Sequence, residues 1–101
     1  MMELLKSLPS IDLHGIDRDY ARILINDFIL DNYKLKSEKI IIIHGVGTGV
    51  IRKTTHEALR RNKFVQDYKT DYFNAGMTVV TLKKNVRSWV LLFLDLYLWL
   101  W

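Results

Sequence analysis

A run of four isoleucines, residues 40–43, is the most regular apolar stretch of the chain. Consecutive β-branched residues without polar alternation are typical of a strand that is buried on both faces, as in the interior of a parallel sheet. His44 follows at the carboxyl end of this stretch, and glycine then occupies every second position over residues 45–49. The pattern predicts a strand, a glycine loop and a helix that begins near Val50.

A second strand end of the same kind lies upstream. Apolar positions within residues 11–13 predict a short strand that ends at His14 and Gly15. Asp17 then suits the N-cap of a helix that ends near Tyr33. The apolar face of this helix follows helical spacing and consists of Ala21, Leu24, Ile25, Phe28 and Ile29. A strand, a helix and a strand of these lengths predict a right-handed crossover with parallel strands.

The rest of the chain predicts one more helix and a hairpin. A helix over residues 50–62 is expected to turn one set of residues inward, namely Ile51, Thr55, Ala58 and Leu59. His56 is expected on the solvated side and receives no role. Alternation over residues 64–73 predicts a third strand, which a turn at 74–76 joins to a fourth strand at 77–83. The order of elements is therefore β-α-β-α-β-β, within the α/β class.

Composition adds an expectation about partners. The chain has 101 residues, half of them apolar, which is enough for one domain with a core. A net charge of +4 and a pI near 9.4 favour a polyanion or an anionic surface as partner. Cysteine is absent, which excludes a disulfide framework and a thiolate zinc site. Glu3 and Lys6 interrupt the few apolar residues at the start, so no secretory signal is predicted and a cytoplasmic location is expected.

The two His-Gly pairs, at residues 14–15 and 44–45, are expected to face each other across one crevice, because neighbouring parallel strands end at the same edge of a sheet. A glycine loop before a helix exposes N–H donors and the positive end of the helix dipole, which favours a phosphate ligand. Arg52 and Lys53 in the first helical turn oppose the dipole and favour the same ligand. Two alternatives stay open: the loop is a plain tight turn, and each histidine bonds only to nearby backbone.

Three segments resemble the small MutS-related (Smr) domain: IDLHG at residues 11–15, HGVGTG at 44–49 followed by VIR, and AGMTVVTLK at 75–83. Their order and spacing agree with that family over residues 10–83 or so. The resemblance implies a two-layer α/β sandwich with two helices packed on a four-stranded mixed sheet, similar to the C-terminal domain of bacterial translation initiation factor three. It leaves residues 1–9 as an N-terminal extension and residues 84–101 as a hydrophobic, aromatic tail.

The resemblance also implies roles for individual residues. Asp12 and His14 match the pair that activates water or serves as acid and base, and His44 opens the phosphate-cradling loop. For phosphodiester hydrolysis, Asp12 would fix His14 as the base and His44 would give a proton to the departing oxygen. The predicted phosphate-binding residues are Gly45, Gly47, Thr48, Gly49, Arg52, Lys53, Arg60 and Arg61. The chain departs from the family pattern at Val46, where lysine is frequent, and at the turn 74–76, which is usually richer in glycine.

These residues predict a nucleic-acid-binding domain, an endonuclease that nicks or cleaves phosphodiester bonds in DNA or RNA. The alternative is a non-catalytic module in which the same crevice only holds a backbone phosphate. Asp12 and a histidine are the only two potential metal ligands expected in the crevice, so a divalent metal is compatible with the site but is not specified by it.

The last fourteen residues, SWVLLFLDLYLWLW at 88–101, lie beyond the region of resemblance. As a helix this stretch would be roughly 20 Å long, short of the ~30 Å hydrocarbon core, so a transmembrane span is not expected. Residues 10–83 already supply a core, so we expect much of the tail to be exposed for a membrane surface or a protein partner. The alternative is a tail without function.

Overall fold

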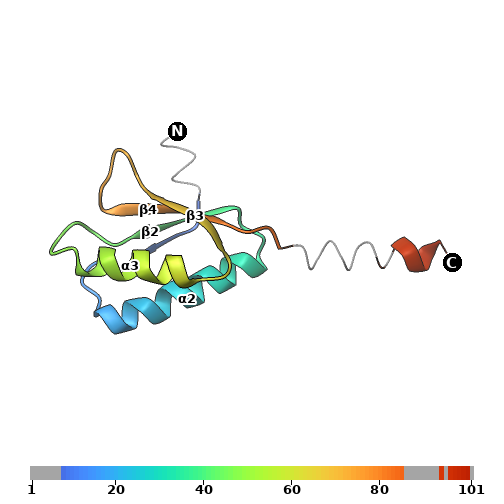
Figure 1. Ribbon diagram of the computed structural model, residues 1–101, viewed down its shortest axis with the longest axis horizontal. Coiled ribbons are helices and arrows are strands. Elements are labelled where there is room, and N and C mark those ends of the chain that lie inside the picture. The colour runs from blue at the N-terminus through green and yellow to red at the C-terminus, as the bar shows by residue number, and fades with distance from the viewer. Residues whose placement is uncertain (1–7, 86–93, 95, 101) are drawn as a thin grey trace.

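The computed structural model describes residues 8–85, 94 and 96–100. The domain is built from six elements in the predicted order (Figure 1). They are β1 (Ser10–Asp12), α2 (Arg18–Lys34), β2 (Lys39–Ile43), α3 (Val50–Arg61), β3 (Val65–Thr70) and β4 (Met77–Leu82).

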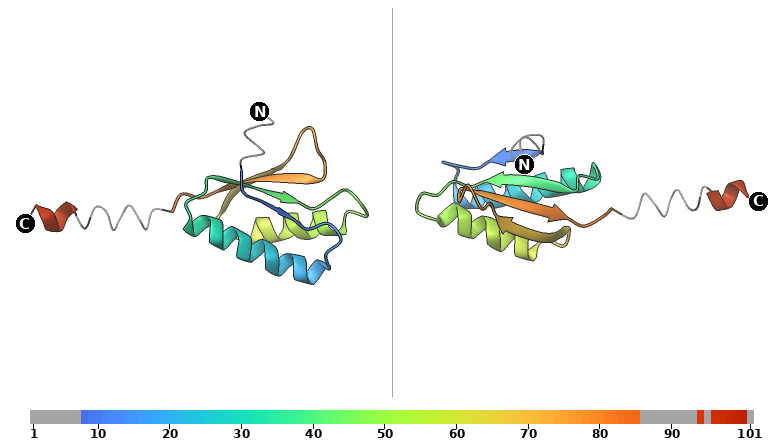
Figure 2. Two further views of the ribbon diagram at one scale, coloured as in Figure 1. Left: turned by 180° about the vertical axis from the view of Figure 1, so that it is seen from behind. Right: turned by 90° about the horizontal axis from the view of Figure 1, so that it is seen from above.

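The four strands form one mixed sheet in the order β1-β2-β4-β3. β1 pairs with β2 in parallel, with Asp12 opposite Ile43, whereas β4 is antiparallel to both β2 and β3. Both helices lie on the same face of this sheet (Figures 1 and 2). The predicted two-layer arrangement, the parallel pairing of the first two strands and the final hairpin are confirmed.

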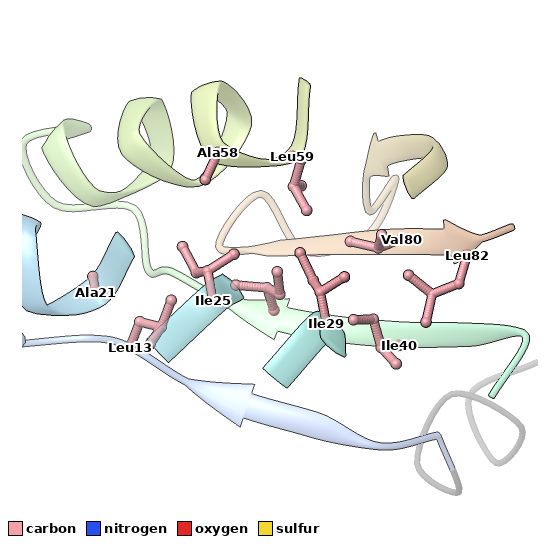
Figure 3. Close-up of a cluster of buried hydrophobic side chains, with 10 residues drawn as sticks. Leu13, Ala21, Ile25, Ile29, Ile40, Ala58, Leu59, Val80 and Leu82 are labelled. Carbon is pink, nitrogen blue, oxygen red and sulfur yellow. The ribbon is translucent and has the colours of Figure 1, made fainter. Parts of the chain in front are cut away.

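The core lies between the helices and the sheet (Figure 3). Its buried members are Leu13, Ala21, Ile25, Ile29, Ile40, Ile42, Ala58, Leu59, Val80 and Leu82. On the other face of β2, Ile41 is also buried and Ile43 is half-buried, as the run of isoleucines predicts. Each fully buried isoleucine contributes about 1.5–3 kcal/mol, so this strand carries a large share of the stability.

The first helix begins where the sequence predicts. The carboxylate of Asp17 accepts hydrogen bonds from the backbone N–H groups of Asp19 and Tyr20, at 3.1 and 3.4 Å. At the other end of the helix Asn32 is buried, which the apolar spacing of the sequence did not predict. Its side-chain oxygen accepts from Ser37 Oγ at 3.0 Å, which ties the end of α2 to the connection that leads into β2.

The predicted third strand is wrong in length and in alternation. A strand over residues 64–73 was expected, but β3 ends at Thr70 and its pairing with β4 shifts by one residue between Val65 and Asp67. This bulge lets Val65 and Tyr68 both pack against the core, although strict alternation puts them on opposite faces. Tyr72 and Phe73 consequently lie in the β3–β4 loop and are exposed.

The described part of the C-terminal tail is apolar and exposed. Leu94, Leu96 and Trp99 have exposed fractions of 52%, 61% and 89%. The remaining positions of the predicted segment 88–101 lie outside the described residues, as do residues 1–7 of the predicted N-terminal extension. Among the described residues, no helix is both long enough and apolar enough to cross a membrane.

Deletion of residues 88–101 should leave a folded domain, because every buried hydrophobic residue that the structure describes lies between Leu13 and Leu82. The expected change in the free energy of unfolding is within about 0.5 kcal/mol, as for changes at surface sites. Urea unfolding followed by circular dichroism would measure it. A truncated protein that is unfolded at room temperature would show that the tail belongs to the core.

Candidate active site

The site lies at the edge of the sheet where β1 and β2 end. The two strands remain paired up to this edge, where the N–H of Leu13 donates to the carbonyl of Ile43 at 2.7 Å. The chain then leaves β1 through His14 and Gly15 and leaves β2 through residues 44–49. Both turns line one pocket of about 330 Å³, together with residues 50–52 of α3. The sequence therefore placed the two His-Gly pairs in the correct relation to each other.

Asp12 and His14 form a hydrogen-bonded pair at the mouth of this pocket. Oδ1 of Asp12 lies 2.6 Å from Nδ1 of His14 and also accepts the backbone N–H of His14 at 3.1 Å. Since a carboxylate only accepts, Nδ1 carries the proton and Nε2 is left as the free nitrogen of the ring. These two hydrogen bonds from His14 hold the pKa of Asp12 below its ordinary value. The His14 side chain is 76% exposed, so a substrate can reach it.

The loop between β2 and α3 offers a series of backbone donors. Gly45, Gly47 and Gly49 all have positive φ, at 77°, 21° and 84°. No backbone N–H from Val46 to Arg52 donates to another group within the described part of the chain. Gly49 is the N-cap of α3 and has no side chain to cap the first turn, which leaves those donors for a ligand.

Gly45 differs from this series. Its N–H and that of His44 both donate to the carbonyl of Gly76, at 3.0 and 2.9 Å. The predicted contribution of the Gly45 N–H to phosphate binding is therefore not available in this arrangement, because the donor is used to fasten the loop. Gly76 approaches closely: a Cβ there would lie 3.3 Å from Gly45 Cα. A side chain at position 76 would therefore crowd the backbone of Gly45, so glycine suits the close approach of this turn to the loop.

His44 is buried beneath the loop, with only 4% of its surface exposed. Its Nδ1 lies 2.8 Å from the carbonyl of Gly45, which can only accept, so this nitrogen carries the proton. Nε2 then accepts from the hydroxyl of Thr78 at 2.8 Å. Burial lowers the pKa of His44, and the nearby charge of Arg52 lowers it further, although the bond to Gly45 opposes this change. His44 is therefore held neutral in a single tautomer.

His56 is the residue that the sequence analysis missed. It was expected on the solvated side of its helix, but it is half-buried and its Nε2 lies 3.1 Å from the hydroxyl of Thr78. Because that hydroxyl gives its one proton to His44, Nε2 of His56 is the donor. Burial is the main cause of its lowered pKa, followed by His44, Arg52 and Arg60. His56, Thr78 and His44 thus form one directed chain of hydrogen bonds from α3 through β4 to the glycine loop. The sequence did contain a sign of this position. His56 precedes the inward-facing Leu59 by three residues, and residues three apart lie on the same face of a helix.

The predicted basic residues divide between two grooves. Arg52, Lys53 and Arg60 line a groove of about 470 Å³ that continues from Gly49 along α3. Arg61 instead lines a groove between α2 and α3, next to Arg22 and Lys63. None of the four predicted cations, at positions 52, 53, 60 and 61, makes an ion pair with a carboxylate among the described residues.

Metal ligands do not gather at the site beyond the predicted pair. Across the described residues, no three His, Asp or Glu side chains lie close enough together to hold a metal ion. Asp12 and His14 offer a carboxylate oxygen and a ring nitrogen, whereas both ring nitrogens of His44, the other histidine that lines the pocket, are engaged in hydrogen bonds.

Comparison with known proteins agrees with this arrangement. The family model of the Smr domain matches residues 11–83. The Smr domain of Thermus thermophilus MutS2 superposes with a TM-score of 0.73 at 29% identity, covering 75% of this chain and 99% of that one. YdaL from Escherichia coli, a small MutS-related protein, has the same fold with a TM-score of 0.72 at 24% identity, covering 82% of this chain and 74% of that one.

Longer proteins contain a similar segment. Endonuclease MutS2 of Clostridium perfringens is 32% identical over 74 residues, which are 73% of this chain and 9% of that protein. Endonuclease MutS2 of Agathobacter rectalis is 34% identical over 86 residues, or 82% of this chain and 11% of that protein. The chain thus spans about a tenth of the length of these relatives. With the family match over most of its length and the fold shared with solved Smr structures, this chain belongs to the Smr domain family.

Proposed function

We propose that this Smr domain is an endonuclease that binds a phosphate of DNA or RNA at its glycine loop and hydrolyses a phosphodiester bond there. The observation that carries the proposal is the position of the Asp12–His14 pair at the mouth of the pocket that the uncapped loop lines. Similarity to proteins named endonuclease MutS2 supports the same reaction class.

The loop supplies the electrostatic part of the reaction. The N–H groups of Gly47, Thr48 and Gly49 have no partner among the described residues. With those of the first turn of α3 they would donate to a bound phosphate and to the charge that grows on its oxygens. Arg52 lines the same pocket and adds a full positive charge. Lys53 and Arg60 continue the positive surface along α3 and suit the next phosphates of the strand.

The Asp12–His14 pair supplies the base. Nε2 of His14 takes a proton from water while the water oxygen attacks phosphorus, and the ionised Asp12 stabilises the imidazolium that results. A histidine held by a carboxylate in one tautomer is the same arrangement that activates nucleophiles in other hydrolases.

His44 is the proposed donor of a proton to the departing oxygen, but its Nδ1–H is already bonded to another group. Its Nδ1–H must exchange the carbonyl of Gly45 for that oxygen. His44 does not become an imidazolate when it loses this proton. Its Nε2 receives the hydroxyl proton of Thr78, and Thr78 in turn receives a proton from Nε2 of His56. His56 is half-buried and regains a proton from solvent on its other nitrogen.

The alternative is a module that binds nucleic acid without cutting it. Val46 favours this reading, since a lysine at that position would add a phosphate contact. Both functions use the glycine loop, but only the endonuclease needs the Asp12–His14 pair. Substitution of that pair therefore distinguishes the two functions.

Replacement of the base should abolish cleavage and retain binding. For His14→Ala, the cleavage rate should fall by about 10²–10⁴-fold, the usual contribution of a general base, while Kd changes little. Asp12→Asn should give a smaller loss, because an amide can still accept from Nδ1 but carries no charge. Single-turnover cleavage of labelled single- and double-stranded DNA and RNA, with and without divalent metal, measures the rates of both variants. Lys34→Ala, at the last residue of α2, is the control. A wild-type protein that binds these substrates but cleaves none of them would exclude the endonuclease and support the non-catalytic binding module.

Binding should weaken as salt rises, with a slope of log K against log salt of about −0.7 to −0.9 for each phosphate that is neutralised. The variant Arg52→Gln/Arg60→Gln should make this slope shallower by roughly one to two units, because both arginines line the groove that runs from Gly49 along α3. Lys34→Gln/Lys39→Gln removes the same charge at the end of α2 and the start of β2, away from the glycine loop, and should leave the slope unchanged. An affinity that does not depend on salt would contradict the phosphate contacts.

The free energy of unfolding should fall as the pH is lowered from 7.5 to 5. The pKa values of His44 and His56 in the folded protein lie below the ordinary value of 6.5, so below pH 6.5 the unfolded chain binds more protons than the folded chain. Stability is therefore full above pH 6.5, decreases through this window and levels off below the folded pKa values. Urea unfolding at several pH values tests this, and His56→Asn should show a shallower dependence. A flat profile for the wild type would mean that the two histidines are not held neutral.

A further inference from the structure

The β3–β4 loop carries two aromatic side chains that make no contribution to the core. Tyr72 is 91% exposed and Phe73 is 85% exposed. Their rings contact each other edge to face, with centroids 5.1 Å apart and an interplanar angle of 82°. An edge-to-face pair of this kind is a favourable arrangement, so the two rings are held by each other while their faces stay open to solvent.

This aromatic pair, Tyr72 and Phe73, lies at the same edge of the sheet as the active site. The loop closes through the N–H of Asp71, which donates to Met77 O, and its last residue Gly76 holds His44 and Gly45. In Figure 1 the β3–β4 loop rises from the end of the sheet where the loop between β2 and α3 also lies. Phe73 is three residues from Gly76, so its Cα lies within about 11 Å of that contact even for an extended chain.

The composition of the loop indicates what the aromatic pair would bind. Residues 71–76 contain no lysine or arginine and one aspartate, so the loop offers no cation to a phosphate. Aromatic rings stack on nucleobases, which all have a π-face, and this contact does not depend on sequence. Bases within a duplex are already stacked on one another, whereas unpaired bases have faces that a side chain can cover.

We infer that Tyr72 and Phe73 stack on unpaired bases next to the phosphodiester held at the glycine loop, and that the domain therefore prefers single-stranded or locally unpaired nucleic acid. This inference rests on the proposed function and names its substrate class. In this arrangement the glycine loop and α3 bind the backbone, and the aromatic pair binds the bases.

The test measures binding by fluorescence anisotropy, on ice and with EDTA so that cleavage is suppressed. It compares three dye-labelled ligands of twelve nucleotides or base pairs: oligo(dT), a strand of abasic sites only, and a blunt duplex. The full-length wild type should bind oligo(dT) more tightly than the abasic strand. Tyr72→Ala/Phe73→Ala should weaken binding to oligo(dT) by about tenfold for each ring, and should leave the abasic strand and the duplex unchanged.

Two control variants make the comparison specific. Tyr72→Phe/Phe73→Tyr keeps both rings and should bind oligo(dT) like the wild type. Leu35→Ala removes a side chain that is 76% exposed at the far end of α2 and should change nothing. All three substituted positions are exposed, so each variant should unfold at the wild-type temperature, which circular dichroism checks.

The outcomes separate this inference from the proposed function. A double alanine variant that binds all three ligands like the wild type overturns the stacking role and leaves the aromatic pair to a protein partner, while cleavage and phosphate binding stand. Equal wild-type affinity for oligo(dT) and the abasic strand overturns it as well. A wild type that binds none of the three ligands overturns the proposed function and this inference together.

Discussion

Two hydrogen bonds to the carbonyl of Gly76 fix the position of the glycine loop, and the rest of the site depends on them. The donors are the N–H groups of His44 and Gly45, the first two residues after β2. The contact is so close that a side chain at position 76 would press on the backbone of Gly45. Once these two donors are used, the N–H groups from Val46 to Arg52 are left for a ligand within the described structure.

With the loop held in this position, the histidines of the site lie in different environments. His14 is exposed and is oriented by an ionised Asp12, whereas His44 and His56 are kept neutral, chiefly by burial. Pairs of titratable groups in contrasting surroundings are a common basis for dividing acid and base roles. Here the exposed pair suits proton abstraction from water, and the buried chain through Thr78 suits the return of a proton.

Much of this arrangement could be predicted because it is local in sequence. The isoleucine run, the N-cap at Asp17 and the spacing of the glycines each act over a few residues, and two parallel strands joined by a helix must end at the same edge. These features, with the short motifs, were sufficient for the sheet, both helices and the relation of the two His-Gly pairs.

The features that could not be predicted depend on how distant elements meet. The bulge in β3 reflects its register with β4, and it moves Tyr72 and Phe73 out of the strand. The burial of His56 depends on how α3 docks over Thr78, and the use of the Gly45 N–H depends on a turn 31 positions later in the chain. Helical spacing alone puts Arg60 and Arg61 outside, but only the packing of α2 against α3 assigns them to different grooves.

The central claim is that a nucleic-acid phosphate binds in the pocket between His14 and the glycine loop. The most direct measurement is a titration of the ¹⁵N-labelled protein with a short phosphorothioate oligonucleotide, followed through its backbone amide signals by NMR. The account predicts saturable shifts at the amides from Val46 to Arg52 and at His14, with Gly45 shifting least of the loop because its N–H is already bonded. Saturable shifts confined to the groove at Arg22, Arg61 and Lys63 would contradict it.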